Sequence, residues 1–263
     1  MAARLCLIGL DPALAQVLRE AHFGPVIVHD TVPKFLVRQG MLYIERHNGV
    51  GMLPVDRVVF HGIYEDDFDF ITALAIWGGP CFPNALGMMN CRLKLPCLAR
   101  ALRISHFNSP RGMVAANTPV QATGPTVAKW GNWHCGENKA KFDGRWIGEE
   151  AAIIEPFFAG ESVRVVSVGE VHLQIRLAGA DWLKSIHADN AAFMPLDPEL
   201  LEDTLRLKAA FGLEMIANDY IVSTESKHLL EVNHIPNMTR FKELRTAYLK
   251  TVRAWLDSRR AGV

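Results

Sequence analysis

Two apolar segments near the end of the chain, EMIANDYIVS (214–223) and KHLLEVN (227–233), restrict the fold more than any other feature. Only a short polar turn, STESK, joins them, so we expect two antiparallel strands that form a hairpin in a largely buried sheet. Three polar side chains interrupt the apolar pattern: Asp219 in the first strand, and Glu231 and Asn233 in the second. Because side chains alternate between the faces of a strand, Glu231 and Asn233 lie on one face.

These three polar residues predict a metal site if the register of the hairpin also brings Asp219 to that face. Carboxylate and amide oxygens are hard ligands that suit Mg²⁺, which often completes its coordination with water and with phosphate oxygens of a substrate. A metal would also offset the cost of burying carboxylates without a counter-charge. The alternative is that Glu231 forms an ion pair with an Arg or Lys near the edge of the sheet.

The N-terminal third of the chain predicts an open α/β sheet. RLCLIGL and PVIVHD are typical of strands, and the segment between them is typical of a helix that begins at Asp11 and Pro12. Asn48-Gly49 predicts a β-hairpin, and a further strand and helix follow it. The turn after the first strand lacks the GxGxxG pattern, which disfavours a dinucleotide-dependent dehydrogenase.

Glycine and proline residues at 78–83 then predict a connector to a second region. NCRLKLPCLARALR (90–103) is typical of a helix, and short strand patterns follow from Gly112 onward. A helix with Asp197 as its cap and Gly212 at its end precedes the hairpin that carries Asp219, and a closing helix follows the hairpin.

The overall composition argues against several classes of partner. The chain has 263 residues and a formal net charge of zero, which disfavours nucleic acid or an anionic membrane as the main partner. Its five cysteines form no CxxC pair and predict neither a disulfide framework nor a zinc site, so we expect a cytoplasmic protein. Neither a signal peptide nor an apolar run of roughly 18 residues is evident.

Four cations precede the acidic hairpin. Lys129 ends the strand pattern PTVAKW, and a glycine-containing segment that could approach phosphates follows it. Arg164 and Arg176 lie on the two strands of a predicted hairpin, and Lys184 follows in DWLKS. Each cation alone is typical of a surface residue. Together with the acidic hairpin they indicate a polyphosphate held between cations and a Mg²⁺ ion.

The segments AIIEPFFAGESVRVVSVGEVHLQIRL, DWLKS and IANDYIVSTESKHLLEVNHIPN resemble the ATP-grasp superfamily. The most similar branch contains bacterial glutathione synthetase and the ligase that adds glutamate to a ribosomal protein. The resemblance is carried by residues 126–237 and is only architectural over residues 1–110. It implies an α/β (α+β) fold with a small N-terminal α/β domain (1–88), a central lid subdomain (89–156) and a C-terminal mixed-sheet subdomain that carries the metal and ATP site (157–263).

The resemblance also implies a ligand set for Mg²⁺ or Mn²⁺ and for ATP. By position, the family's metal ligands correspond to Asp219, Glu231 and Asn233. The residues that correspond to its ATP contacts are Lys129, Glu155, Arg164, Lys184 and a first lysine at either Arg92 or Lys94. Arg176 matches an arginine of the acyl-phosphate site, and Lys184 stands where the family has another arginine, so both are expected to act in catalysis.

In this family a carboxylate attacks the γ-phosphate of ATP, and an amine then displaces phosphate from the acyl phosphate to form an amide. The resemblance therefore implies a carboxylate–amine ligase, expected to be a homo-oligomer, that acts on small molecules or peptides. The chain departs from the family at Ser162 and Ile186, and its lid between Lys129 and Glu155 is shorter. These departures leave two alternatives open: an ATP-binding protein that has lost catalysis, and a kinase that phosphorylates a hydroxyl.

Overall fold

The computed structural model describes residues 2–131, 138–179 and 182–258. Its N-terminal region contains a parallel sheet with the strand order β2-β1-β6-β7. These strands are β1 (Leu5–Ile8), β2 (Val26–His29), β6 (Arg57–Phe60) and β7 (Cys81–Phe82). The first three were expected from sequence. The segment at 78–83 was predicted to be a connector, and this prediction is wrong because its residues 81–82 form the last strand of the same sheet.

Two helices and a small antiparallel sheet complete this region. The expected first helix, α1 (Pro12–Ala21), begins where the Asp11 carboxylate accepts hydrogen bonds from the N–H groups of Ala13 and Leu14. The small sheet contains the predicted Asn48-Gly49 hairpin between its last two strands. Its strands and the second helix are β3 (Phe35–Arg38), β4 (Met41–Glu45), β5 (Met52–Val55) and α2 (Asp67–Trp77).

The predicted helix at 90–103 is interrupted. The chain forms α3 (Ala85–Arg92) and α4 (Lys94–Ile104), separated by Leu93 in an extended conformation. Pro96 lies in the first turn of α4, where its missing N–H would have no helical partner in any case. The break therefore lies just before the proline, and it gives Arg92 and Lys94 to two different helices.

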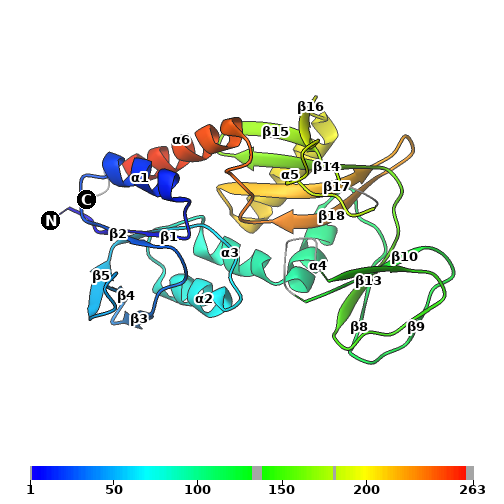
Figure 1. The fold of residues 1–263 in the computed structure, drawn as a ribbon, viewed down its shortest axis with the longest axis horizontal. Coiled ribbons are helices and arrows are strands. Elements are labelled where there is room, and N and C mark those ends of the chain that lie inside the picture. The colour runs from blue at the N-terminus through cyan, green and yellow to red at the C-terminus, as the bar shows by residue number, and fades with distance from the viewer. Residues whose placement is uncertain (1, 132–137, 180–181, 259–263) are drawn as a thin grey trace.

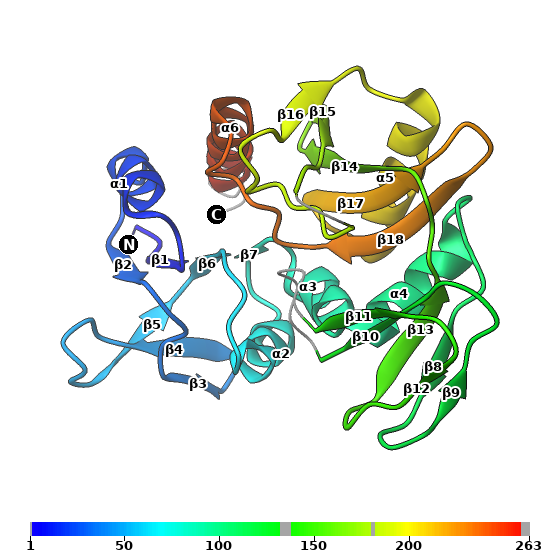
Figure 2. The same ribbon diagram turned by 45° about the vertical axis from the view of Figure 1, so that its right-hand side comes forward.

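A central antiparallel sheet has the strand order β11-β10-β13-β8. Two short strands from the same stretch of chain, β9 and β12, pair with each other in a separate sheet. The strands of these two sheets are β8 (Gly112–Val114), β9 (Val120–Gln121), β10 (Thr126–Trp130), β11 (Lys139–Phe142), β12 (Arg145–Trp146) and β13 (Ala152–Pro156). Figure 2 shows α4 between the central sheet and β18 of the next one. The central sheet thus faces the hairpin that carries Glu231.

The C-terminal sheet is antiparallel and has the order β16-β15-β14-β17-β18. Its elements are β14 (Glu161–Val168), β15 (Val171–Arg176), β16 (Ala192–Met194), α5 (Pro198–Phe211), β17 (Met215–Val222), β18 (Lys227–Asn233) and α6 (Lys242–Ser258). A buried polar network binds α5 to one face of this sheet: the Tyr220 hydroxyl donates to Asp203, and the Thr204 hydroxyl is 3.0 Å from that of Tyr220. The opposite face of the sheet is therefore turned toward α4 and the central sheet.

The last helix connects the two ends of the molecule. Figure 1 shows α6 beside α1, and α6 also contacts β14 of the C-terminal sheet. The guanidinium of Arg57, on β6 of the first sheet, donates to the carbonyl oxygen of Leu256 on α6 at 3.0 Å. None of the helices in the described ranges combines the length and the apolar content needed to cross a membrane.

Candidate functional site

The register of the C-terminal sheet aligns three charged residues in a row. Arg164 on β14 lies directly opposite Asp219 on β17, and Asp219 lies opposite Glu231 on β18. Directly opposed residues share a face, and Asn233 lies two residues beyond Glu231. The three oxygen donors predicted from sequence therefore belong to one face of the sheet, the face away from α5.

Arg164 and Asp219 form a two-pronged ion pair on this face. Nε of Arg164 is 2.6 Å from one carboxylate oxygen of Asp219, and Nη2 is 2.7 Å from the other. Their side chains are 13% and 11% exposed, so water screens the pair weakly. Burial disfavours the charged guanidinium, but the charge and hydrogen bonds of Asp219 outweigh it, so the pKa of Arg164 is above its ordinary value.

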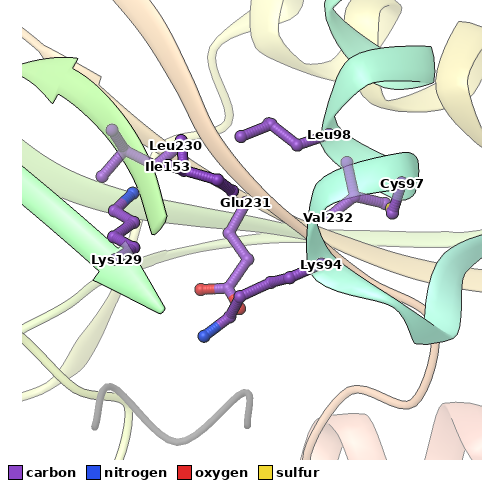
Figure 3. Close-up of a pocket in the computed structure, with 8 residues that line it drawn as sticks. All are labelled: Lys94, Cys97, Leu98, Lys129, Ile153, Leu230, Glu231 and Val232. Atoms are coloured by element: carbon purple, nitrogen blue, oxygen red, sulfur yellow. The ribbon is translucent and has the colours of Figure 1, made fainter. Parts of the chain in front are cut away.

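Glu231 points into a pocket between the two sheets. The pocket is lined by α4, β10, β13 and β18, through Lys94, Cys97, Leu98, Lys129, Ile153, Leu230, Glu231 and Val232. Figure 3 shows the Lys94 ammonium group and the Glu231 carboxylate pointing toward each other from α4 and β18. A neighbouring hollow of ≈ 250 Å³ shares Lys94, Lys129 and Ile153 with this pocket. The two together form one cleft, lined by lysines on the α4 and β10 sides.

The position of the first family lysine can now be assigned by geometry. Arg92 forms a buried ion pair of 2.5 Å with Asp67 on α2 and also donates to the carbonyl oxygen of Tyr64. It is therefore directed toward the N-terminal region, whereas Lys94 lines the cleft beside Glu231. Of the two alternatives, only Lys94 is brought to the candidate site.

Lys129 and Glu155 lie on the cleft face of the central sheet. The Lys129 ammonium group is 2.5 Å from one Glu155 oxygen, and Arg111 Nε is 2.5 Å from the other. Burial alone would raise the pKa of Glu155, but the two cations hold it below its ordinary value. Burial lowers the pKa of Lys129, although Glu155 and, more weakly, Glu231 act in the opposite direction. Glu155 is thus an ionised carboxylate shared by two buried cations.

Arg111 is a site residue that the sequence interpretation missed. Its Nη2 donates to the carbonyl oxygen of Leu229, so this one guanidinium bridges β13 and β18 across the cleft. Its Nη1 is buried and has no hydrogen-bond partner among the described residues. Arg111 comes just before β8, whose Gly112 pairs with Ile154. The pairing of β8 with β13 places Arg111 next to Glu155. No local sequence pattern predicts this pairing.

The two residues expected to act in catalysis are not brought to this cleft. Arg176 lies opposite Val163, one position away from Arg164, so the alternation of strand side chains directs it to the other face of the sheet. There it pairs with Glu161 at 2.5 Å, with its side chain 56% exposed. The placement expected for Arg176 is therefore corrected. Lys184 is exposed, donates to the carbonyl oxygen of Gly179 in its own loop, and does not line the cleft.

The donor set limits what kind of metal site this face could form. Within the described ranges, no three His, Cys, Asp or Glu side chains converge as metal ligands. Asp219, Glu231 and Asn233 supply two carboxylates and one amide, and the buried Asn233 amide nitrogen has no hydrogen-bond partner in the part of the chain that the structure describes. Such a set fits a hard cation that shares its coordination with phosphate oxygens, one of which could accept from this nitrogen. Residues 132–137 of the expected lid between Lys129 and Glu155 lie outside the described residues.

Comparison with known proteins identifies the architecture of the chain. No family model and no curated protein sequence matches the chain. Solved structures do match over nearly its whole length. One is D-alanine–D-alanine ligase from Bacillus anthracis in complex with ATP, with a TM-score of 0.62, 16% identity, and coverage of 98% of this chain and 99% of that one.

Two further neighbours were solved with peptides. The RiPP-associated ATP-grasp ligase of Chryseobacterium gregarium, in complex with ADP and a leader and core peptide, has a TM-score of 0.60 at 10% identity and covers 97% of both chains. The macrocyclase MdnC of Microcystis aeruginosa, bound to precursor peptide MdnA, has a TM-score of 0.58 at 14% identity, with 95% of this chain and 99% of that one covered. The chain therefore has the ATP-grasp fold, as the sequence resemblance implied.

Proposed function

We propose that the protein is an ATP- and Mg²⁺- or Mn²⁺-dependent carboxylate–amine ligase that forms an amide bond through an acyl phosphate. The observation that carries this proposal is the alignment of Asp219 and Glu231 on the sheet face that borders a lysine-lined cleft. An array of oxygen ligands opposite ammonium groups is what binding of a metal–polyphosphate complex requires.

In this proposal the residues of the cleft bind and orient ATP. Lys94 and Lys129 contact phosphate oxygens, and Glu155 with Arg111 holds the nucleoside end. Asp219, Glu231 and Asn233 would hold the metal, which when bound neutralises charge on the phosphate oxygens. A substrate carboxylate oxygen then attacks the γ-phosphorus and ADP leaves; an amine nitrogen attacks the acyl carbon and phosphate leaves. Positioning and charge neutralisation supply the catalysis, and no nucleophilic side chain is needed.

We further propose an amino acid, a peptide or a related metabolite as the substrate. One structural neighbour was solved with a leader and core peptide and another with a precursor peptide, which supports a peptide among these options. ADP release should be screened with mixtures of acids and amines, including short peptides. Hydroxylamine traps an acyl phosphate as a hydroxamate, whereas a phosphorylated hydroxyl is insensitive to it. Hydroxamate formation would support the ligase, and a stable phosphorylated product would indicate a kinase.

The nucleotide site itself is tested by calorimetry. We expect wild-type protein to bind ATP more tightly with Mg²⁺ than without it, and Glu231→Ala with Asn233→Ala to lose most of this gain. Arg176→Ala is the matched control, because Arg176 lies on the opposite face of the same sheet. ATP binding that is absent, or identical in the wild type and the double variant, would contradict the proposal.

Two observations favour a second candidate, a nucleotide-binding protein without ligase activity. The arginine expected at the acyl-phosphate site is turned away from the cleft, and Ser162 and Ile186, where the chain departs from the family, are both buried. ATP binding without ADP release with any tested pair of substrates, unaffected by Glu231→Ala, would support this candidate.

A further inference from the structure

We propose that Arg164 is a built-in counter-ion, which neutralises Asp219 when no metal is bound and makes binding of a divalent metal at this hairpin depend on nucleotide. Arg164 is thus a positioning residue for the metal rather than a catalytic one. The inference rests on the proposed function for the metal site at Asp219 and for the identity of the nucleotide. The observation that carries it is the contact of Arg164 with both carboxylate oxygens of Asp219.

The first argument is the occupancy of Asp219. Both of its carboxylate oxygens accept hydrogen bonds from one guanidinium, at 2.6 and 2.7 Å. A forked guanidinium bound to a carboxylate in this way is among the stronger side-chain pairings. A metal that uses Asp219 must therefore either displace one of these hydrogen bonds or bind next to the guanidinium, whose positive charge repels it. A cation that brings no replacement partner for Arg164 leaves a largely buried guanidinium without its counter-charge.

The second argument is the local charge. The cleft face of the C-terminal sheet carries Arg164 on β14 and Asp219 on β17 as a pair, and Lys94 faces Glu231 from α4. These four groups have no net charge. A divalent cation alone would add two positive charges to a cleft from which water is partly excluded, which is unfavourable. A polyphosphate that arrives with the metal supplies the negative charge that restores the balance.

A polyphosphate also gives Arg164 a new partner. Arginine binds phosphate oxygens with the same two-pronged geometry that it uses for carboxylates. Exchange of Asp219 for a phosphate oxygen would free Asp219 for the metal while the guanidinium keeps a counter-charge. Nucleotide and metal would then bind with positive coupling, because each removes the cost of binding the other.

The β14–β15 hairpin, which carries Arg164, offers a matched control. Arg176 on β15 also pairs with a carboxylate, Glu161, but on the opposite face and with both side chains about half exposed. Replacement of either arginine by glutamine removes one positive charge from the same pair of strands. Only Arg164→Gln exposes a carboxylate beside Glu231.

The experiment measures Mn²⁺ binding from the electron paramagnetic resonance signal of free Mn²⁺, without nucleotide and with ADP, after subtraction of the Mn²⁺ that the same concentration of ADP binds without protein. We expect wild-type protein to bind Mn²⁺ about tenfold more tightly with ADP than without it. Without nucleotide, Arg164→Gln should bind Mn²⁺ about tenfold more tightly than wild type, and ADP should add little. Arg176→Gln should behave as wild type. An Arg164→Gln affinity no higher than that of wild type in the absence of nucleotide overturns the proposal.

Two further variants complete the test: Arg164→Lys keeps it decisive if Arg164→Gln folds poorly, and a double variant locates the bound metal. Arg164→Lys retains the charge but not the fork, and its nucleotide-free Mn²⁺ affinity should lie between those of wild type and Arg164→Gln. In the double variant Arg164→Gln with Asp219→Asn, the increase in nucleotide-free Mn²⁺ affinity over wild type should disappear. If the increase persists, Mn²⁺ binds elsewhere and the proposal is overturned.

Failure of this inference is distinguishable from failure of the proposed function. If Mn²⁺ affinity rises in Arg164→Gln without nucleotide while no variant binds ATP or ADP, the counter-ion role of Arg164 stands, whereas its coupling to nucleotide and the ligase proposal both fall. If Mg²⁺-dependent ATP binding is found but the nucleotide-free gain is absent, only the counter-ion role falls.

Discussion

Arg111 and Glu155 form a buried ion pair whose guanidinium also hydrogen-bonds the carbonyl oxygen of Leu229 on the opposite sheet. One side chain thus joins the central sheet to β18 across the cleft. The backbone supports this junction, because the N–H of Leu229 donates to the carbonyl oxygen of Phe107 at 2.9 Å. The segment before β8 is therefore attached to the hairpin strand that carries Glu231.

We predict that Arg111→Met weakens nucleotide binding by about 10- to 100-fold, because Glu155 loses one counter-charge and β18 loses its contact with β13. Calorimetry measures the affinity, and hydrogen exchange should show faster exchange at residues 227–229. Arg100→Met is the control, since Arg100 is an exposed α4 residue whose guanidinium caps the carbonyl oxygen of Ala210. Equal nucleotide affinity in the two variants would contradict the bridging role.

Substitutions of Arg92 and Lys94 should separate folding from binding. Arg92→Met leaves Asp67 buried without its partner and should lower the free energy of unfolding by about 3–5 kcal/mol. Lys94→Met should instead weaken nucleotide binding by about 10- to 100-fold, with a smaller effect on stability. Thermal unfolding measures the stability of both variants, and calorimetry measures their nucleotide affinity. A larger loss of stability in Lys94→Met than in Arg92→Met would exclude the assignment.

Glu155 gives a prediction for the pH dependence of stability. Its folded-state pKa is below the ordinary value of 4.5, so its ion pairs stabilise the fold fully above that pH. This stabilisation is lost as the pH falls below about 4.5 and through the folded-state pKa. We expect Glu155→Gln to be less stable than wild type by about 3–5 kcal/mol at neutral pH, and the difference to shrink on acidification. Denaturant unfolding between pH 3 and 7 measures the difference in stability between the variant and the wild type. A difference that stays constant over this pH range would contradict the prediction.

Tyr220 tests the assignment of the sheet faces. Tyr220→Phe removes a hydroxyl that donates to buried Asp203, so we expect a loss of about 1–3 kcal/mol in the free energy of unfolding. Because Tyr220 faces α5 and not the cleft, nucleotide affinity should remain at the wild-type value. Asp219→Asn, one residue away on the other face, should change metal-dependent nucleotide binding instead. A large fall in affinity in Tyr220→Phe would show that the two faces are not independent.

Elements with local signals were predicted well from sequence. The helix α5 begins at Pro198 after its Asp197 cap and ends before Gly212, as expected, because capping bonds and a left-handed glycine act within a few residues. The strand β7 was missed because two residues between glycines and prolines carry no periodicity. Its pairing with β6 depends on packing between distant segments, which a local pattern does not contain.

The residues of the candidate site also divide into those with a local sequence signal and those placed by the packing of distant segments. The alignment of Asp219 with Glu231 follows from a short hairpin, whereas the bridge made by Arg111 depends on β8, β13 and β18 together. The error on Arg176 was avoidable. The tight Gly169-Glu170 turn pairs Val168 with Val171, and this register already places Arg164 and Arg176 on opposite faces.

The packing of α6 has a consequence for how the chain matures during translation. Phe82 in the first sheet contacts the rings of Tyr248 and Trp255, and Arg57 is bonded to the backbone of the same helix. The strands that carry Arg57 and Phe82 leave the ribosome more than 150 residues before this helix does. The N-terminal sheet therefore cannot complete its core until α6 has been synthesised, and until then the Phe82 ring lacks the two aromatic rings that it contacts in the folded chain.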